Sequence, residues 1–296
     1  MEHPTIGDRI SGAFIYAALA VILVLVLYPL IYVLSASVSE PSAVIEGRMW
    51  LFPVDLTFTG YNKIFHNEEV LIGYRNTILY TVVGTAINLF MTTAAAYPLS
   101  RKDFAGRGVI TAILVFTMFF SGGLIPTYLL IKSLHMINTI WALILPGAVS
   151  VYNIIIMRTF FQMSIPPELQ EAAAIDGCGN LQTLWRIVLP LSMPILAVML
   201  LFYSVGHWNS YFNALIYLSE RNKFPLQLFL REILVKGEVD NMVQGGAAMI
   251  GQDQQILDAE IIKYAMVVVA NVPIFLLYPF LQKYFVKGIM IGAIKG

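Results

Sequence analysis

Residues 164–194 concentrate charged and turn-forming side chains in a chain that is otherwise apolar. Within this stretch, Glu171 and Asp176 flank an alanine run over 172–174, and Gly177 follows directly. The carboxylates can form ion pairs with the cations of a partner, and the small alanine side chains let that partner approach closely. The same pattern also suits a helix lying at a membrane surface, with its apolar side among lipid headgroups. In either case the chemistry is binding, not catalysis.

Turn-forming residues predict a helix, a sharp turn and a second helix in this stretch. Ser164 can cap the first helix, and two prolines shortly after it suit a first helical turn. Gly177 and Gly179 permit the positive φ that ends a helix. Asn180 is a candidate cap for the second helix.

A second group of polar residues lies in an apolar segment around residues 203–213. At helical spacing four of them would share one face: Ser204, His207, Trp208 and Tyr211. Hydroxyl, amide and aromatic groups together suit a sugar, although they also join helices by hydrogen bonds or settle at the membrane interface. The residues predicted to line a substrate path are Tyr152, Asn153, Ser204, His207, Trp208, Asn209, Tyr211, Asn213 and Asn271.

The sequence contains none of the common motifs for catalysis, nucleotide binding or metal binding. There is no GxxxxGK[ST], HExxH or GxSxG pattern. A single cysteine excludes an internal disulfide and a cysteine-built metal site. We therefore expect a chain that is not an enzyme and that binds no metal or cofactor itself. The net charge of zero gives no indication of nucleic-acid binding.

The elements that would position these residues are membrane helices. Hydrophobic residues make up 58% of the 296 residues and charged residues 12%, which is too apolar for a soluble domain. A bilayer crossing needs roughly 20 apolar residues. The predicted fold is all-α, a single polytopic domain over 1–296 with six transmembrane helices near 13–34, 76–99, 108–131, 138–158, 188–218 and 264–282.

The charges flanking these spans predict the orientation. Arg101, Lys102 and Arg107 crowd one short connection, and the tail after the last span carries lysines without an acid. By the positive-inside rule these segments and both termini face the cytoplasm, since the remaining cations lie in long loops where the rule has little force. The spans themselves hold essentially no ionisable group away from their ends, unlike proton-coupled carriers. The energy for transport would then come from a separate ATPase.

Two sizeable loops, 35–75 and 219–263, would lie outside. A loop that only joined two spans needs a handful of residues. We expect these loops to form a docking surface for an external protein, the alternative being a plain cap over the bundle.

The stretch 164–194 resembles the EAA loop of importer-type ATP-binding cassette (ABC) transporter permeases. Glu171-Ala172-Ala173, Asp176-Gly177, Ile187, Leu189-Pro190 and Pro194 stand in that family's order and spacing, with Cys178 in place of the usual alanine. In the family this loop forms coupling helices that dock in a groove of the ATPase. The resemblance assigns a cytoplasmic coupling loop to 164–187, and it assigns ATPase coupling to Glu168, Glu171, Ala172, Ala173, Asp176, Gly177, Leu189, Pro190 and Pro194.

Other segments resemble carbohydrate-uptake permeases. FTGYNKIF, YRNTILYT and AYPLSRKDFAGR match the regions around the second span, and the ending resembles the tail of the second permease of maltose-type systems. There the tail reaches the interface between two ATPase subunits. The matching residues are Lys287, Gly288, Gly292, Lys295 and Gly296. The group that is most similar takes up complex oligosaccharides.

This resemblance implies a type I importer permease in a bacterial cytoplasmic membrane, forming half of a translocation path for a carbohydrate. Its expected partners are a second homologous permease, two ATPase subunits that hold ATP and magnesium, and an external substrate-binding protein. Three alternatives stay open: an importer of another solute class, a self-sufficient secondary carrier or channel, and a membrane enzyme built around His207.

Overall fold

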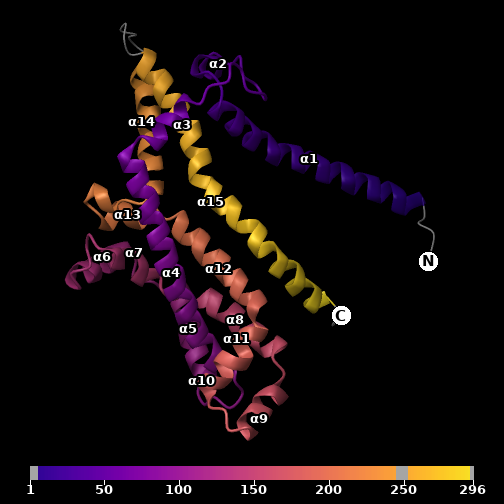
Figure 1. Cartoon of the computed structure of the whole chain (residues 1–296). Coiled ribbons are helices and arrows are strands. Elements are labelled where there is room, and N and C mark those ends of the chain that lie inside the picture. The colour runs from indigo at the N-terminus through magenta and orange to yellow at the C-terminus, as the bar shows by residue number, and fades with distance from the viewer. Residues whose placement is uncertain (1–5, 245–252, 294–296) are drawn as a thin grey trace. The chain divides into compact units, whose positions relative to one another are not determined.

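The computed structural model describes residues 6–244 and 253–293 (Figure 1), and in these residues all assigned regular structure is helical. The all-α prediction is confirmed. The helices are α1 (Ile6–Ser37), α2 (Pro41–Ile45), α3 (Thr59–Phe65), α4 (Glu68–Ser100), α5 (Arg107–Phe119), α6 (Leu124–Ser133), α7 (Ile140–Ile144), η1 (Leu145–Gly147), α8 (Val151–Ser164), α9 (Pro167–Ile175), α10 (Asn180–Thr183), η2 (Leu184–Val188), α11 (Leu189–Leu191), α12 (Met193–Trp208), α13 (Phe212–Tyr217), η3 (Arg221–Lys223), α14 (Leu226–Gln244) and α15 (Asp253–Ala293).

Three of the described helices contain an uninterrupted segment long and apolar enough to cross a membrane: Ile10–Ser37 of α1, Glu68–Ser100, which is α4, and Ala259–Leu277 of α15. Three bent helix pairs pass the same test together, so the described chain has up to six spans if each pair crosses once. These six segments overlap the six predicted ones. That each bent pair forms one crossing stays a prediction.

The third, fourth and fifth predicted spans differ from continuous helices. The axis bends by 110° between α5 and α6, by 51° between α7–η1 and α8, and by 84° between α10–α11 and α12. Gly123, with φ of +83°, lies at the first break, and Pro146 lies in the 3-10 turn before the second. At the third break the chain turns at Ser192, just before Pro194. Glycine and proline interrupt helical hydrogen bonding, which hydropathy alone does not report.

The chain divides into two compact units. The first comprises the residues up to Val70 together with Leu230–Val272, and the second comprises Leu71–Phe229 and the residues from Pro273 onward. In the first unit α3 packs tightly on α15, because a Cβ added at Gly60 would lie 2.9 Å from the Ile261 carbonyl oxygen.

The core of the second unit joins α4, α8, η2 and α12. Its buried members include Tyr97, Met157, Phe161, Val188 and Met199. Within this unit α9 lies at one end, beside α10, and α6 and α13 lie toward the opposite end (Figure 1). The predicted coupling stretch is therefore attached directly to the helices that build the core.

Candidate functional site

Helix α9 exposes most of its surface. Ala173 is its single buried residue, at 3% exposure, whereas Ile175 is 87% exposed. Glu168 and Glu171 are also exposed on α9, and Asp176 is exposed directly after it. A helix with this little burial is not held by packing along its length, so its ends must define its position.

The C-terminal end of α9 is fixed by a hydrogen-bonded turn. The N–H of Cys178 donates to the Ala173 carbonyl over 2.8 Å, and the N–H of Gly177 donates to the Ala174 carbonyl over 3.1 Å. These two bonds and the φ of +78° at Gly177 make a Schellman motif. The prediction that Gly177 ends the helix with positive φ is confirmed.

Three of the predicted turn roles are wrong. Gly179 has φ of −70° and precedes α10 as its N-cap, so Asn180 is the first residue of that helix and not its cap. Ser164 is the last residue of α8, and α9 begins after Pro166 without a side-chain cap. The turns here consist mainly of backbone hydrogen bonds, so capping side chains were poor guides to the boundaries.

The second helix of the stretch contains a π-helical turn. The N–H of Leu189 donates to the carbonyl of Leu184, five residues earlier. Pro190 follows directly and has no N–H to continue the α-helical pattern, which accounts for the local widening. Leu184 and Val188 are buried in the core of the second unit, while Trp185 is exposed. The segment is therefore anchored on one side and open on the other.

The turn between α4 and α5 carries an ion pair with two hydrogen bonds. Arg101 donates from Nε to Asp103 Oδ1 over 2.8 Å and from Nη2 to Oδ2 over 2.7 Å, and its Nη1 donates to the Tyr97 hydroxyl over 3.2 Å. The bond from Arg101 lowers the pKa of Asp103, and the same bond raises the pKa of Arg101. Arg107 donates to the Arg101 carbonyl over 3.1 Å. Two of the cations predicted to face the cytoplasm, Arg101 and Arg107, therefore organise this turn.

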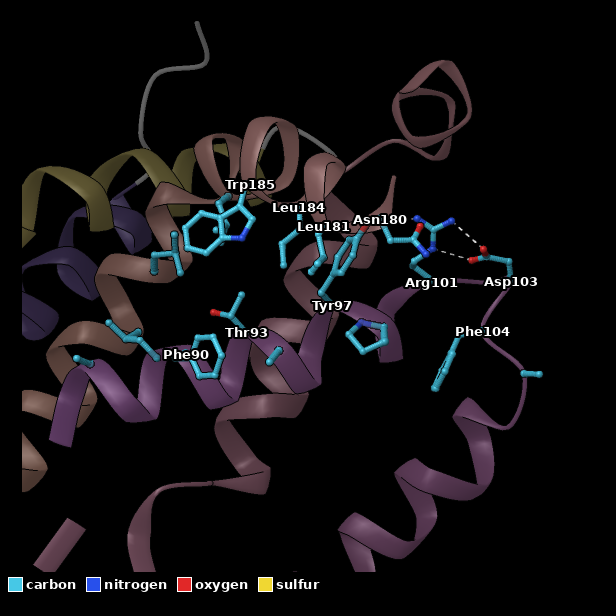
Figure 2. A pocket seen from close by; sticks show the side chains of 17 residues that line it. Phe90, Thr93, Tyr97, Arg101, Asp103, Phe104, Asn180, Leu181, Leu184 and Trp185 are labelled. Atoms are coloured by element: carbon cyan, nitrogen blue, oxygen red, sulfur yellow. Dashed lines mark hydrogen bonds and ion pairs between the residues drawn. The ribbon is translucent and has the colours of Figure 1, made fainter. Parts of the chain in front are cut away.

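Two cavities adjoin the turn. The larger, of about 820 Å³, lies between α4 and the α10–α12 segment, and Figure 2 shows Trp185 at one end of it and the Arg101–Asp103 pair at the other. The smaller, of about 520 Å³, is lined by Lys102 of the turn and Glu171 of α9. The exposed helix α9 therefore borders a groove with both acidic and basic walls.

His207 takes part in a polar network inside the second unit. Its Nε2 lies 2.6 Å from Asn88 Oδ1, and Asn88 Nδ2 donates to the Gly147 carbonyl over 2.7 Å. A Cβ added at Gly84 would lie 2.4 Å from His207 Nε2, so only glycine admits the ring. The network joins α4 and α12 to η1, the turn that follows α7. The sequence analysis missed Asn88, although an amide inside the apolar segment 76–99 was an available signal.

The predicted shared face holds for Ser204, His207 and Trp208, which lie on one helix, but it is wrong for Tyr211. Helix α12 ends at Trp208, and Tyr211 is the N-cap of α13 beyond the break. Ser204 donates its hydroxyl to the Leu200 carbonyl of its own helix over 2.6 Å, and Trp208 is buried. These side chains of α12 pack inside the protein.

The remaining predicted path residues are more varied. Asn209, Tyr211 and Tyr152 are exposed, Asn213 is partly exposed, and Asn153 is buried. Asn271 lies in the other unit and donates to the Val267 carbonyl of its own helix over 2.7 Å. The substrate-path role of these residues stays a prediction.

The structure describes only some of the C-terminal residues that are predicted to reach the ATPase interface. Lys287, Gly288 and Gly292 lie within α15, whereas Lys295 and Gly296 lie outside the described residues. Among the residues described, no group of three or more histidine, cysteine, aspartate or glutamate side chains is placed to hold a metal ion.

Comparison of the sequence with known proteins identifies a matching family and similar relatives. A family described as binding-protein-dependent transport system inner membrane component matches residues 70–291, three quarters of the chain. The polygalacturonan/rhamnogalacturonan transport system permease protein YtcP of Bacillus subtilis (strain 168) is 39% identical over 98% of this chain and 99% of its own length. Protein LplC of the same organism is also 39% identical, over 99% of this chain and 98% of its own length.

Structural comparison agrees with the sequence comparison. A chain from the crystal structure of a bacterial ABC transporter involved in the import of the acidic polysaccharide alginate matches with a TM-score of 0.85 and 34% identity, covering 96% of this chain and 100% of that chain. A chain from a bacterial alginate ABC transporter in complex with alginate pentasaccharide-bound periplasmic protein matches with a TM-score of 0.57 and 15% identity, covering 93% of each. The second match supports the fold alone.

Proposed function

The chain belongs to the family of binding-protein-dependent transport system inner membrane components, and from this we propose that it forms half of the path of an ATP-driven oligosaccharide importer. It is a transport subunit of a membrane complex and not an enzyme. The other half of the path would come from a second, homologous permease, because one subunit of this size supplies only one wall for an oligosaccharide.

The exposure of α9 is the observation that carries this proposal. A helix with one buried residue, a fixed C-terminal turn and two exposed carboxylates has the features of a docking element. Its continuation, η2 and α11, leads directly into α12, and Leu184 and Val188 pack in the core with α4 and α8. A push on α9 would therefore move helices that line the path and not only a surface loop.

The expected source of this push is a pair of ATPase subunits that hold ATP and magnesium. Glu171 and Asp176 are exposed and can pair with cations of such a subunit. The groove beside α9 also presents Lys102 to a partner. Charges of both signs in one groove favour a particular orientation of the docked protein. Both termini and α9 would lie on the cytoplasmic side, and the C-terminal tail would approach the ATPase interface.

The proposed substrate class is an acidic oligosaccharide. This assignment rests on the relatives, whose names give polygalacturonan, rhamnogalacturonan and alginate as their substrates. In this chain the break between α12 and α13 exposes Asn209 and Tyr211, an amide and a phenol that can bind sugar hydroxyls. An external substrate-binding protein would deliver the sugar to the opposite face from α9.

Uptake by proteoliposomes tests the function. The chain is reconstituted with the second permease, the ATPase and the binding protein, and uptake of labelled galacturonate oligomers is compared with uptake of neutral maltooligomers and amino acids. We expect uptake of the acidic sugar to require both ATP and the binding protein. Uptake by this chain alone, driven by an ion gradient, would establish a secondary carrier instead. ATP-driven uptake of amino acids only would refute the sugar assignment.

A further inference from the structure

Residues 45–58, here called the aromatic loop, expose large apolar side chains outside the predicted spans. Trp50 and Phe52 are each 75% exposed, and Leu56 and Phe58 are also among the exposed large hydrophobic residues. The loop precedes residues 70–291, the part of the chain that the family model matches. An exposed cluster of this kind marks a binding surface.

The aromatic loop is held against the end of α1. Ser35 donates its hydroxyl to the Leu51 carbonyl over 2.6 Å, and the N–H of Thr57 donates to the Val38 carbonyl over 2.9 Å. The N–H of Val54 also donates to the hydroxyl of Ser39 over 3.1 Å. Figure 1 shows α2 and the adjoining chain folded beside this end of α1. These hydrogen bonds therefore fix the position of the loop along the axis of α1.

These attachments determine which side chains point outward. Leu51 and Thr57 are partly buried where they bond to the end of α1, whereas both neighbours of each residue are exposed. Met49, together with Ala36 and Val44, forms a buried cluster beneath the loop. The exposed aromatic residues are thus not loose ends of an unfolded segment, because an apolar cluster and three hydrogen bonds support them from below.

The length of α1 gives the position of the loop in a membrane. The apolar segment Ile10–Ser37 has 28 residues, and it is exposed along most of its length, up to the buried residues 35–37 under the loop. At about 1.5 Å per residue it spans about 42 Å, which exceeds a hydrocarbon core of roughly 30 Å and equals the thickness including headgroups. Leu34, beside Ser35, is itself exposed on the face that would meet lipid. Residues bonded to Ser35 therefore lie at the level of the headgroups and not in bulk water.

We propose that the aromatic loop inserts Trp50 and Phe52 into the phospholipid headgroup layer and anchors the outer end of α1 there. Tryptophan and phenylalanine side chains at this depth bury apolar area while staying near polar groups. The charged part of the loop is compatible with this placement, since Arg48 pairs with Glu46 over 2.7 Å and both side chains are at least half exposed to water. The occupant is a lipid surface. The inference depends only on α1 crossing the bilayer and goes beyond the transport proposal.

A fluorescent probe at two loop positions tests this placement. Phe52→Cys and the matched control Arg48→Cys are made in a Cys178→Ala background, labelled with an environment-sensitive dye, and reconstituted as the whole transporter in phosphatidylcholine vesicles. Quenching by lipids carrying a nitroxide near the headgroup is compared with quenching by aqueous iodide. We expect the probe at 52 to be quenched at least about threefold more by the lipid nitroxide than the probe at 48, and iodide to quench position 48 preferentially.

Two results would overturn the proposal. Equal iodide quenching at both positions would place the loop in water. Protection of position 52 from both quenchers would show that a protein subunit covers it. Trp50→Cys gives a second site for the same measurement, and because both aromatic residues are mainly exposed, neither replacement removes a buried contact.

Discussion

Replacing Gly177 by alanine should weaken coupling to the ATPase, because alanine strains the backbone at this position. Gly177 has φ of +78°, a conformation that costs a residue with a Cβ roughly 1–2 kcal/mol. No atom lies within 4 Å of an added Cβ at this position, so no clash contributes. Gly179 supplies the matched control, because its φ is −70° and its added Cβ would also meet nothing within 4 Å. The two variants add the same methyl group to the same turn, and only the one at position 177 forces alanine into a positive φ.

The size of the effect follows from the Schellman motif. A cost of 1–2 kcal/mol changes an equilibrium roughly 5–30-fold. If the ATPase binds α9 with this turn formed, Gly177→Ala should weaken its binding by that factor. Gly179→Ala should weaken it less, because its only cost is the preference of an N-cap for glycine over alanine. Gly177→Asn should fall between them, because asparagine tolerates the left-handed conformation better than alanine.

The assay is titration of the purified ATPase onto permease in proteoliposomes, followed by initial rates of ATP-driven uptake. Equal losses for Gly177→Ala and Gly179→Ala would show that added bulk and not the turn conformation matters. Wild-type affinity for Gly177→Ala would show that the turn is not part of the docked structure.

Three further predictions address charge, packing and pH. Glu171→Lys should reduce ATP-driven uptake more than tenfold while membrane insertion, followed by membrane fractionation, stays normal, because a like charge at a docked surface costs several kcal/mol; normal uptake would contradict the coupling role. Asn88→Ala removes both hydrogen bonds of a fully buried amide and should lower the free energy of unfolding by about 1–3 kcal/mol; an unchanged Tm of the purified protein would contradict the structural role of the network. The lowered pKa of Asp103 means that its bond from Arg101 stabilises the protein at neutral pH and is lost as the pH falls through that lowered value. The difference in Tm between wild type and Asp103→Asn should therefore be constant above about pH 5 and shrink below about pH 4; a constant difference down to pH 3 would refute it.

The local features of the candidate site were predictable from sequence because short-range rules determine them. The Asp176-Gly177 pair gave the end of α9 correctly, since a positive φ at glycine ends a helix whatever surrounds it. The apolar segments likewise gave the positions of the candidate spans. The capping roles of Ser164 and Asn180 failed because Pro166 and Gly179 occupy those places in the chain.

The long-range features were not predictable in the same way. The bond between His207 and Asn88 joins residues 119 positions apart, and the sequence analysis had assigned only the histidine, to a substrate path. The attachment of Leu51 to Ser35 depends on a loop folding back over 16 residues. Hydropathy also predicted three continuous spans, whereas glycine and proline bend the chain within each of them. In each case tertiary packing, which single-sequence patterns do not contain, decided the outcome.

The single cysteine of the chain offers the most direct test of the central claim, that α9 and its turn receive the ATPase on the cytoplasmic face. Cys178 lies in that turn and is partly exposed, so the wild-type protein can be probed without substitution. The rate of alkylation by a membrane-impermeant maleimide is measured from each side of the membrane, with the ATPase bound and after its removal. The account predicts labelling from the cytoplasmic side only, and at least about tenfold slower labelling with the ATPase bound. Labelling from the outer side, or a rate that does not change when the ATPase is removed, would contradict it.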